Sequence, residues 1–505
     1  MDDREGQLTI ASNRLPVVLK QRCGRWSVQP GSGGLVQAMA PVLKARGGRW
    51  VGWPGVTTEE GEGWSRGLAG VGEAAGYDLG PVVLDADELE DYYEGFANSV
   101  LWPLFHGFPG RCCFSPEFYE AYGRVNQRFA EALTGGGEGE LTWIHDYHLL
   151  EVARRLRQSG HRGRLAFFLH IPFPSAEIFS KLPWRERLLT DLLHFDLIGF
   201  QTERDVAHFQ ASVERLGIEG EVNEVGQGVR FELGGRAAEA AAFPISIDYR
   251  DFAERAASQE VSRRCRELAK EIGPGQVLLG IDRLDYSKGL IHRLQAYERA
   301  LEQFEELREE VVFFQLVVPS RENVPEYRQL KREFDRMVGR INGRFSTAAW
   351  QPIHYLYNRV DPVELSALYR LASVALVTPL RDGMNLVAKE YCASQVEADG
   401  VLVLSEFAGA AEQLAAGALL VNPYDTEKLA EAIHRGVKMD RSERRERMTR
   451  MQAIIEATDV YWWARAFLER ASKCGEEIGQ LVELTERPFA AASAGTVGVS
   501  RSPEK

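Results

Sequence analysis

The sequence predicts an α/β fold divided into two domains, and three features lead to this prediction. Short apolar runs such as 277–281 and 374–378 precede glycine-containing turns and then helix-forming segments, a pattern typical of buried parallel strands. The 505 residues, 45% of them hydrophobic, suffice for two separate cores. Gly273-Pro-Gly275 interrupts the pattern near mid-chain, and we place the domain boundary a little earlier, near Asp248.

This boundary divides a first domain, 1–248, from a second domain, 249–455. The charged stretch 249–272 is predicted to be helical. The last residues, 488–505, are rich in Ala, Ser and Gly, and we expect them to be disordered.

Composition and charge exclude several classes of protein. The formal net charge of −13 disfavours a nucleic-acid partner or an anionic membrane surface. The six cysteines show no C-x-x-C and no paired zinc spacing, and the acidic start lacks the apolar segment of a secretory leader. No run approaches the roughly 18 apolar residues that a membrane span needs. We therefore expect a cytoplasmic protein that binds neither nucleic acid nor membrane.

Polar side chains follow apolar strands in the first half. Arg14 ends the first strand. Asp146 follows a strand that starts at Leu141, and His170 follows one that starts at Leu165. Open α/β sheets bind ligands at the carboxyl ends of their strands, so these three residues are candidates for a binding site. A solvent-exposed arginine and a hydrogen-bonded core histidine are the alternatives.

A glycine-rich loop opens the first long helix. Gly33 and Gly34 would let the backbone approach a phosphate or a sugar closely. The spacing differs from the G-x-G-x-x-G dinucleotide fingerprint, so no NAD site is predicted, and an ordinary turn remains an alternative.

The segment 92–106 is dense in aromatic residues, and most of them are expected to pack in the core. Tyr93 and Trp102 alternate with polar residues in a loop-like context. Because sugar sites favour such amphipathic rings, both are candidates for a sugar site.

Two metal-site interpretations are weaker. Asp85-Ala-Asp87 could hold a divalent cation, but the acidic residues around it are more typical of a helix N-terminus. His145 and His148 lack a third ligand nearby in the sequence.

Cations follow the strands of the second half. Arg283 and Lys288 lie in a glycine-bounded loop after a buried strand, a spacing that suits a diphosphate and the charge that builds on it as it leaves. Arg321 follows the apolar run 311–318, again at the carboxyl end of a strand. A solvated basic loop is the alternative.

The stretch 376–390 is the centre of the predicted site. An apolar strand ends at Pro379, Gly383 breaks the pattern, and Asn385 is a plausible N-cap for a helix that begins at Leu386. The free N–H groups and the dipole of such a helix favour an anion. Glu390, one turn further, could accept hydrogen bonds from ligand hydroxyls, whereas an exposed glutamate is the alternative.

Taken together, six motifs over about residues 8–475 resemble those of the α,α-trehalose-6-phosphate synthase family of retaining glycosyltransferases. They are Ser12-Asn-Arg14, Leu101-Trp-Pro-Leu-Phe-His106, His145-Asp-Tyr-His148, His170-Ile-Pro-Phe-Pro174, Asp282-Arg-Leu-Asp-Tyr-Ser-Lys-Gly289 and Arg381-Asp-Gly-Met-Asn-Leu-Val-Ala-Lys-Glu390.

The resemblance implies a GT-B fold, in which two Rossmann-like domains face each other across a deep cleft and a C-terminal helix, within 456–487, crosses back to the first domain. It also implies transfer of glucose from a nucleotide sugar, usually UDP-glucose, to glucose 6-phosphate. No cofactor and no metal are implied. The expected partners beyond the substrates are further copies of the chain, as a dimer or tetramer, and a separate trehalose-phosphate phosphatase.

The resemblance also assigns roles to individual residues. Those expected to hold the acceptor, with the two arginines on its phosphate, are Arg14, Tyr93, Trp102, Asp146 and Arg321. Those expected to hold the donor are Gly33, Gly34, His170, Arg283, Lys288, Asp382, Gly383, Met384, Asn385, Leu386, Val387 and Glu390. The expected catalytic residues are Arg283, Lys288, His170 and Asp382.

Two features bear on mechanism and donor choice. Val360 stands where some members of the family carry a phenylalanine against the nucleotide base, so strict preference for UDP is in doubt. No carboxylate in the motifs is a convincing covalent nucleophile, and we therefore expect front-face displacement assisted by the leaving phosphate.

Three other functions are compatible with parts of this pattern. A sister transferase could use glycerol 3-phosphate or a cyclitol phosphate as the acceptor, because acceptor residues lie on loops. A regulatory paralogue could lack activity, although the donor residues are all present. A GT-B phosphorylase would need a lysine that carries pyridoxal phosphate.

Overall fold

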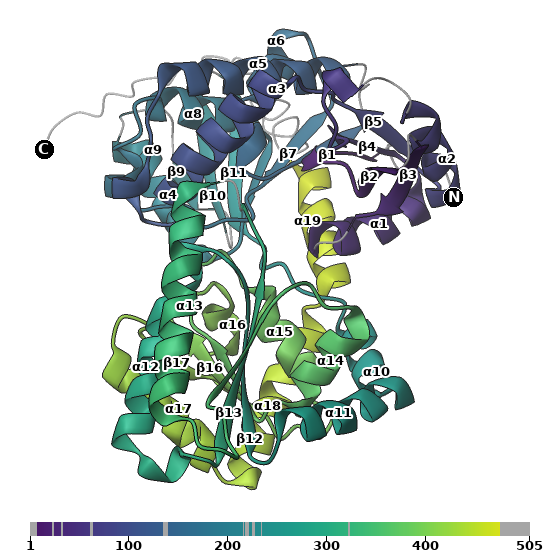
Figure 1. Cartoon of the computed structure of the whole chain (residues 1–505). Helices are drawn as coiled ribbons and strands as arrows, with labels where there is room; N and C mark the ends of the chain where they lie inside the picture. The colour runs from purple at the N-terminus through teal and green to yellow at the C-terminus, as the bar shows by residue number, and fades with distance from the viewer. Residues whose placement is uncertain are drawn as a thin grey trace, which may run out of the picture.

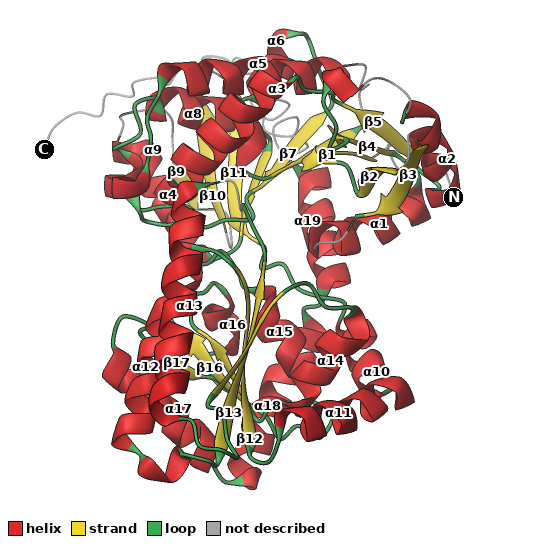
Figure 2. Ribbon diagram, viewed as in Figure 1, coloured by secondary structure: helices red, strands yellow, loops and turns green. Residues whose placement is uncertain are grey.

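The structure is a computed structural model, and it describes residues 8–22, 25–31, 34–60, 64–134, 140–215, 217, 222–224, 228–233, 235–321 and 324–474. Two mostly parallel sheets, one above the other, are each flanked by helices (Figures 1 and 2). The predicted α/β fold class is confirmed. Gly33 and the tail 488–505 lie outside the described residues.

The first sheet has nine strands, and seven of them are parallel. In spatial order these seven are β5 (Asp78–Pro81), β4 (Arg49–Trp53), β1 (Leu8–Arg14), β6 (Leu141–His145), β7 (Arg164–Phe168), β8 (Leu197–Phe200) and β11 (Arg236–Ala242). Antiparallel β10 (Gly228–Leu233) and β9 (Val222–Glu224) extend one edge, and β2 (Val17–Arg22) pairs separately with β3 (Arg25–Pro30). The strand order reverses between β1 and β6, which places Arg14 and Asp146 on either side of the reversal.

The second sheet has six parallel strands. In spatial order they are β14 (Ile353–Tyr357), β13 (Val311–Val318), β12 (Gln276–Arg283), β15 (Val374–Val377), β16 (Val401–Ser405) and β17 (Leu419–Val421). The order reverses between β12 and β15. Ligands of doubly wound sheets bind at this reversal, outside the carboxyl ends of the strands. The loops after β12 and β15 carry Lys288 and Asn385.

Helices cover both sheets (Figure 2). With the first sheet are α1 (Gly34–Arg46), α2 (Ser65–Ala75), α3 (Ala86–Glu88), a π-helix (Leu89–Leu101), α4 (Trp102–Phe105), α5 (Pro116–Ala132), α6 (Val152–Gln158), α7 (Ala176–Phe179), α8 (Arg185–Leu192) and α9 (Glu203–Arg215). With the second are α10 (Tyr249–Ala257), α11 (Gln259–Ile272), α12 (Leu290–Gln303), α13 (Pro325–Phe345), α14 (Pro362–Leu371), α15 (Leu386–Ala393), α16 (Ala410–Leu414), α17 (Thr426–Lys438) and α18 (Arg441–Ala457). No helix of the described residues is both long and apolar enough to cross a membrane.

The predicted helix over 249–272 is interrupted at Ser258. This residue is extended, with φ −63° and ψ 155°, and its side chain accepts a hydrogen bond from the N–H of Val261. Serine competes well for a helix N-terminus, so α10 ends and α11 begins there.

The last described helix, α19 (Val460–Lys473), leaves the second sheet and packs on the first (Figure 1). The ring of Phe467 stacks on that of Trp143, with centroids 4.2 Å apart. A Cβ atom on Gly199 would lie 2.6 Å from the Phe467 ring, so glycine permits this close approach. The N–H of Val460 bonds the carbonyl of Ile247, 3.0 Å away, and the two chain crossings therefore lie side by side.

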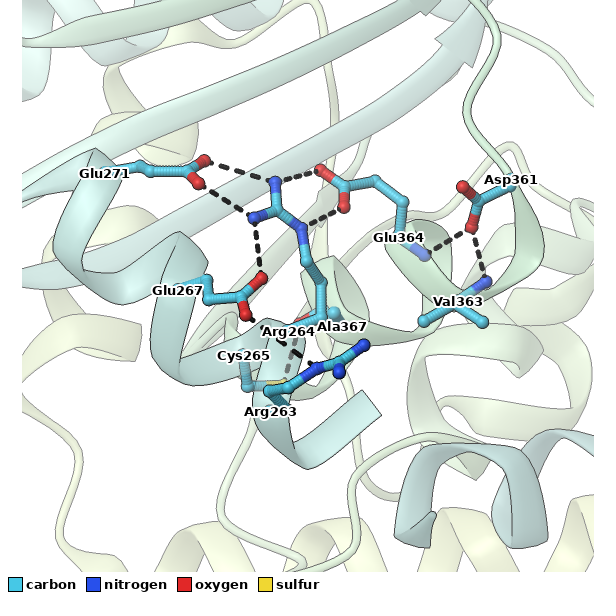
Figure 3. Close-up of polar contacts among 9 residues, drawn as sticks. All are labelled: Arg263, Arg264, Cys265, Glu267, Glu271, Asp361, Val363, Glu364 and Ala367. Carbon is cyan, nitrogen blue, oxygen red and sulfur yellow. Dashed lines mark hydrogen bonds and ion pairs between the residues drawn. The ribbon is translucent and has the colours of Figure 1, made fainter. Parts of the chain in front are cut away.

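An ion cluster joins α11 to α14 (Figure 3). The Arg264 guanidinium bonds Glu271 of its own helix and, at 3.0 Å, Glu364 of α14. Asp361 caps α14 by accepting from the N–H groups of Val363 and Glu364, both at 2.9 Å. The cluster is partly exposed and contributes little net stability, but it fixes the helix that carries Tyr369, a contact of the predicted site.

A buried lysine joins α15 to the segment before α10. Lys389 has no exposed surface, and its Nζ donates to the carbonyl of Ile245, 2.7 Å away. Burial lowers the pKa of Lys389 to about 7. The lysine is therefore mostly neutral in the folded protein at mildly alkaline pH, although it would be charged in the unfolded chain.

We predict a pH dependence of stability from this lysine. Between pH 7 and pH 10 the unfolded state binds the extra proton, so raising the pH favours the folded state. The free energy of unfolding of the wild type, relative to Lys389→Met, should rise by up to about 1.4 kcal/mol per pH unit between pH 7 and pH 9. Denaturant titrations of both proteins measure this difference, and a constant difference would contradict the prediction.

Candidate active site

The loops after β12 and β15 meet at the strand-order reversal of the second sheet. Nζ of Lys288 lies 2.6 Å from Oδ2 of Asp382, and the same oxygen accepts a hydrogen bond from Nδ2 of Asn385 at 3.0 Å. Burial alone would raise the pKa of Asp382, but the charge of Lys288 keeps it below its usual range. Three of the predicted donor residues are thus in direct contact.

These loops lie above a buried polar network. The guanidinium of Arg293, with no exposed surface, pairs with Asp282 at 2.5 Å and donates to Thr378 Oγ1 at 2.9 Å. It also donates to Gln315 of β13, 3.1 Å away. Because Asp282 precedes Arg283 and Thr378 follows β15, this network fixes the start of both loops.

The turn before α15 has the geometry of an anion site. Asn385 adopts φ 76°, and its side chain accepts from the N–H of Ala388 at 3.3 Å, so it is the N-cap that the sequence predicts. Leu386 and Val387 follow as the first helical residues, whose N–H groups lack intrahelical partners. Met384 is buried, and its carbonyl accepts from Ala410 N at 2.8 Å.

Glu390 lies one helical turn further. One of its carboxylate oxygens accepts from the hydroxyl of Tyr369 at 2.6 Å, and burial raises its pKa. The residue is half-buried, so its carboxylate can also meet a ligand hydroxyl.

Asp146 and His170 meet beyond the carboxyl ends of β6 and β7, in the middle of the first sheet. Asp146 has φ 75°, unusual for a residue with a side chain, and its Oδ1 accepts from the N–H of His170 at 3.2 Å. Burial raises the pKa of Asp146 to about 7, against opposing contributions from backbone N–H groups and from the charge of Arg283. Arg283, from the other sheet, therefore lies close enough to act on Asp146.

Arginines from both sheets lie over aromatic rings of the first. The guanidinium of Arg321 is 4.2 Å from the centre of the Trp102 ring, and that of Arg283 is 5.7 Å away. Arg14 lies 4.5 Å from the Trp53 ring and 5.8 Å from the Tyr93 ring. Such contacts hold a guanidinium while leaving its N–H groups able to bind a phosphate.

Asp285 and Tyr327 also hold the guanidinium of Arg321. Its NH1 lies 3.5 Å from Oδ2 of Asp285 and bonds the hydroxyl of Tyr327, which itself donates to Asp285 at 3.0 Å. Burial would raise the pKa of Asp285, but the charges of Arg321, Lys288 and Arg283 lower it overall. The carboxylate is therefore ionised and balances part of the positive charge.

Direct contacts join the two sheets beside these residues. A Cβ atom on Gly383 would lie 2.4 Å from the His170 carbonyl oxygen, so only glycine fits there. Arg381 lies 3.5 Å from Asp205. The predicted site residues of the two halves consequently face each other.

Some residues are not placed with this group. Gly34 begins α1, and Gly33 lies outside the described residues. Asp85 caps α3 by accepting from the N–H of Glu88 at 2.7 Å, as the helix N-terminus interpretation predicts. A cavity of about 250 Å³ beside Arg236 and Arg470 is lined by none of the predicted site residues.

Sequence reasoning missed several partners of the site. Tyr369, Asp285 and Tyr327 bond predicted residues. Tyr369 and Tyr327 lie within helices α14 and α13, so no apolar strand leads directly to either of them. Asp285 had a local signal, because its side chain accepts from the N–H of Ser287 and so begins the turn that carries Lys288. The described residues hold no group of three His, Cys, Asp or Glu side chains placed to bind a metal.

The family model of glycosyltransferase family 20 matches residues 6–473. A trehalose-phosphate synthase from Dictyostelium discoideum, named as UDP-forming, is 40% identical over 95% of the chain and 64% of its own length. A bifunctional trehalose-6-phosphate synthase/phosphatase from Thermoproteus tenax is 41% identical over 95% of the chain and 66% of its own length. The chain thus spans just under two thirds of these two relatives. A trehalose-6-phosphate synthase from Mycolicibacterium paratuberculosis is 40% identical over 93% of the chain and 96% of its own length.

Two solved structures share the fold. A UDP-forming trehalose-phosphate synthase from Burkholderia xenovorans, in complex with glucose-6-phosphate, aligns with a TM-score of 0.83 at 35% identity, over 92% of this chain and 100% of that one. An E. coli protein bound with UDP-2-fluoro glucose aligns with a TM-score of 0.82 at 36% identity, over 93% of this chain and 99% of that one.

We predict that Gly383→Ala destabilises the contact between the halves. The added methyl group would overlap the His170 carbonyl, and such overpacking costs roughly 1–3 kcal/mol. Gly339→Ala is the matched control, because an added Cβ there meets nothing within 4 Å in the middle of α13. That variant should be up to about 1 kcal/mol more stable than the wild type. Denaturant titrations measure both changes, and equal stabilities would contradict the overlap.

Proposed function

Because the chain belongs to glycosyltransferase family 20, we propose that it transfers glucose from UDP-glucose to glucose 6-phosphate and forms α,α-trehalose 6-phosphate. The relatives named as UDP-forming synthases support this donor. The bound glucose-6-phosphate of the Burkholderia xenovorans structure supports this acceptor. The observation that carries the proposal is that Arg283 and Arg321 of one half lie against Trp102 of the other.

The acceptor would lie against the first sheet. Arg14 and Arg321 would bind its phosphate, while the rings of Tyr93 and Trp102 would contact the sugar. Asp146, whose pKa is raised to about 7, can exchange between accepting and donating a hydrogen bond, which suits contact with a hydroxyl.

The donor would lie against the second sheet and α1. Arg283, Lys288 and the N-terminus of α15 would bind the diphosphate. The backbone from Met384 to Val387, with Gly33 and Gly34, would approach the sugar and diphosphate. Glu390 would accept hydrogen bonds from the ribose hydroxyls.

The chemistry that fits this set is displacement from the front face. The bond between the anomeric carbon and the diphosphate breaks, the acceptor hydroxyl attacks the same face, and a departing phosphate oxygen takes its proton. Arg283 and Lys288 would stabilise the negative charge that develops on the leaving group. His170 and Asp382 would hold the glucose between the two halves, which we assign to 1–248 and 249–455.

The nucleotide base would lack an aromatic stacking partner at position 360. Val360 is half-buried and packs against the core of the second half, where an aromatic side chain would be needed for stacking. Selection of uracil would then depend on other contacts.

Three further expectations stay predictions. They are a cytoplasmic location, a homo-oligomer of two or four chains, and a separate phosphatase that acts on the product. In the Thermoproteus tenax relative the two activities are named for a single protein, so that arrangement exists among relatives of this chain.

An activity assay tests the proposal. With glucose 6-phosphate as acceptor, UDP-glucose should give a phosphorylated non-reducing disaccharide and free UDP, detected by mass spectrometry and nucleotide analysis. GDP-glucose and ADP-glucose measure base selectivity, and glycerol 3-phosphate and inositol phosphate measure acceptor selectivity. Transfer to either of these alone would favour a sister transferase, and no transfer at all would favour a regulatory protein.

Two variants should separate the roles of the cations. Lys288→Ala removes charge that acts mainly on the leaving group, so kcat should fall by about 10²–10³. Arg321→Ala removes a phosphate contact present before and during reaction, so the KM for glucose 6-phosphate should rise with a smaller effect on kcat. Arg340→Ala is the control, because Arg340 lies on the exposed face of α13 and pairs with Glu298. Normal turnover by Lys288→Ala would contradict its assignment.

A further inference from the structure

Two histidines on neighbouring strands share a hydrogen bond beside the predicted site. His145 ends β6, and His170 lies two residues beyond the end of β7. Nδ1 of His145 and Nε2 of His170 are 3.1 Å apart. His145 has no exposed surface and lies against the Trp143 ring, whereas His170 is half-buried.

Burial favours the neutral form of both rings. Burial lowers the pKa of His170 to about 3, and burial together with His170 lowers the pKa of His145 well below its usual value. A hydrogen bond between two neutral imidazoles requires an N–H on one nitrogen and a lone pair on the other. Which ring donates depends on the surroundings of the other two nitrogens, Nε2 of His145 and Nδ1 of His170.

The surroundings of His145 favour one arrangement. Its Nε2 is buried and has no hydrogen-bond partner among the described residues. If His145 accepted at Nδ1, its proton would lie on Nε2 as a buried N–H without an acceptor. If it donates from Nδ1, only a lone pair is left there, and unsatisfied acceptors are more readily tolerated than unsatisfied donors.

We propose that His145 is a positioning residue, which donates from Nδ1 to Nε2 of His170 and thereby keeps the proton of His170 on its Nδ1. Among the described residues Nδ1 of His170 makes no hydrogen bond, so this N–H is available to a hydroxyl oxygen of the donor sugar. A Cβ atom on Gly383 would lie 2.4 Å from the carbonyl oxygen of His170, so this residue lies next to the donor loop. This inference rests on the proposed function, since it names the atom that meets the donor.

The pair has two consequences for ligand binding. A neutral imidazole on its own exchanges between two tautomers and can rotate by half a turn. The hydrogen bond from His145 removes this freedom before the ligand arrives, so less is lost when the ligand binds. Without His145, part of the population would present a lone pair to this hydroxyl and could not donate to its oxygen.

The tautomer can be measured directly on the wild-type full chain. In protein labelled with ¹⁵N-histidine, the resonance of His170 is assigned by its loss in His170→Gln. We expect Nδ1 of His170 to have the chemical shift of a protonated nitrogen and Nε2 that of an unprotonated one. The reverse pattern would overturn the proposal. The spectrum needs no substrate, so its outcome is independent of whether the proposed activity is correct.

Kinetics of variants test the role. His145→Leu should raise the KM for UDP-glucose roughly ten- to a hundredfold, the effect of one lost or mispaired hydrogen bond, and leave the KM for glucose 6-phosphate unchanged. His145→Asn places an amide N–H near the position of Nδ1 and should restore most of the affinity. In a His170→Leu background, His145→Leu should have no further effect on this KM.

His194→Leu is the matched control. His194 is also a partly buried histidine with a ring hydrogen bond, to the carbonyl of Thr190. It precedes the amino end of β8, whereas His145 and His170 lie at the carboxyl ends of their strands. Its kinetics should equal those of the wild type. Equal changes in both substrates' KM in His145→Leu, or additive effects of His145→Leu and His170→Leu, would show a merely structural role and overturn the proposal.

Discussion

The ion pair of Arg293 and Asp282 is the interaction on which the arrangement of the site depends. A buried guanidinium and a buried carboxylate are costly unless their hydrogen bonds are satisfied, and here Thr378 and Gln315 supply the additional contacts. The network joins the ends of β12 and β15 to the middle of β13. The loops that carry Arg283, Lys288 and Asn385 therefore begin from fixed positions at the strand-order reversal.

The same logic extends to the charges above this network. The charge of Lys288 is balanced by Asp382, and that of Arg321 by Asp285. These ion pairs hold the cations in place without a ligand. Aromatic rings of the first half cover Arg14, Arg283 and Arg321. An acidic protein thus concentrates positive charge at one place, where the phosphates of both proposed substrates could bind in exchange for the internal carboxylates.

The sequence predicted those features that depend on neighbours along the chain. The apolar runs before Arg14, Asp146, Arg283 and Arg321 are strands, and the N-cap at Asn385 is present. Pairs such as Tyr369 with Glu390 and Arg321 with Asp285 depend on how elements pack, and no local pattern shows them. The break at Ser258 was missed because charged helix formers continue on both sides of it. The roles of the site residues and the boundary near Asp248 remain predictions.

The two crossings of the chain between the sheets restrict how the halves can move. The segment before α10 and the start of α19 run side by side, joined by Val460 to Ile247 and by the hydroxyl of Tyr461 to Asp248 at 2.8 Å. A single connection would allow the halves to rotate about several axes. Two adjacent connections favour rotation about the axis that runs through both of them. We therefore expect the halves to approach each other by rotation about this axis, which would bring the same residues together each time.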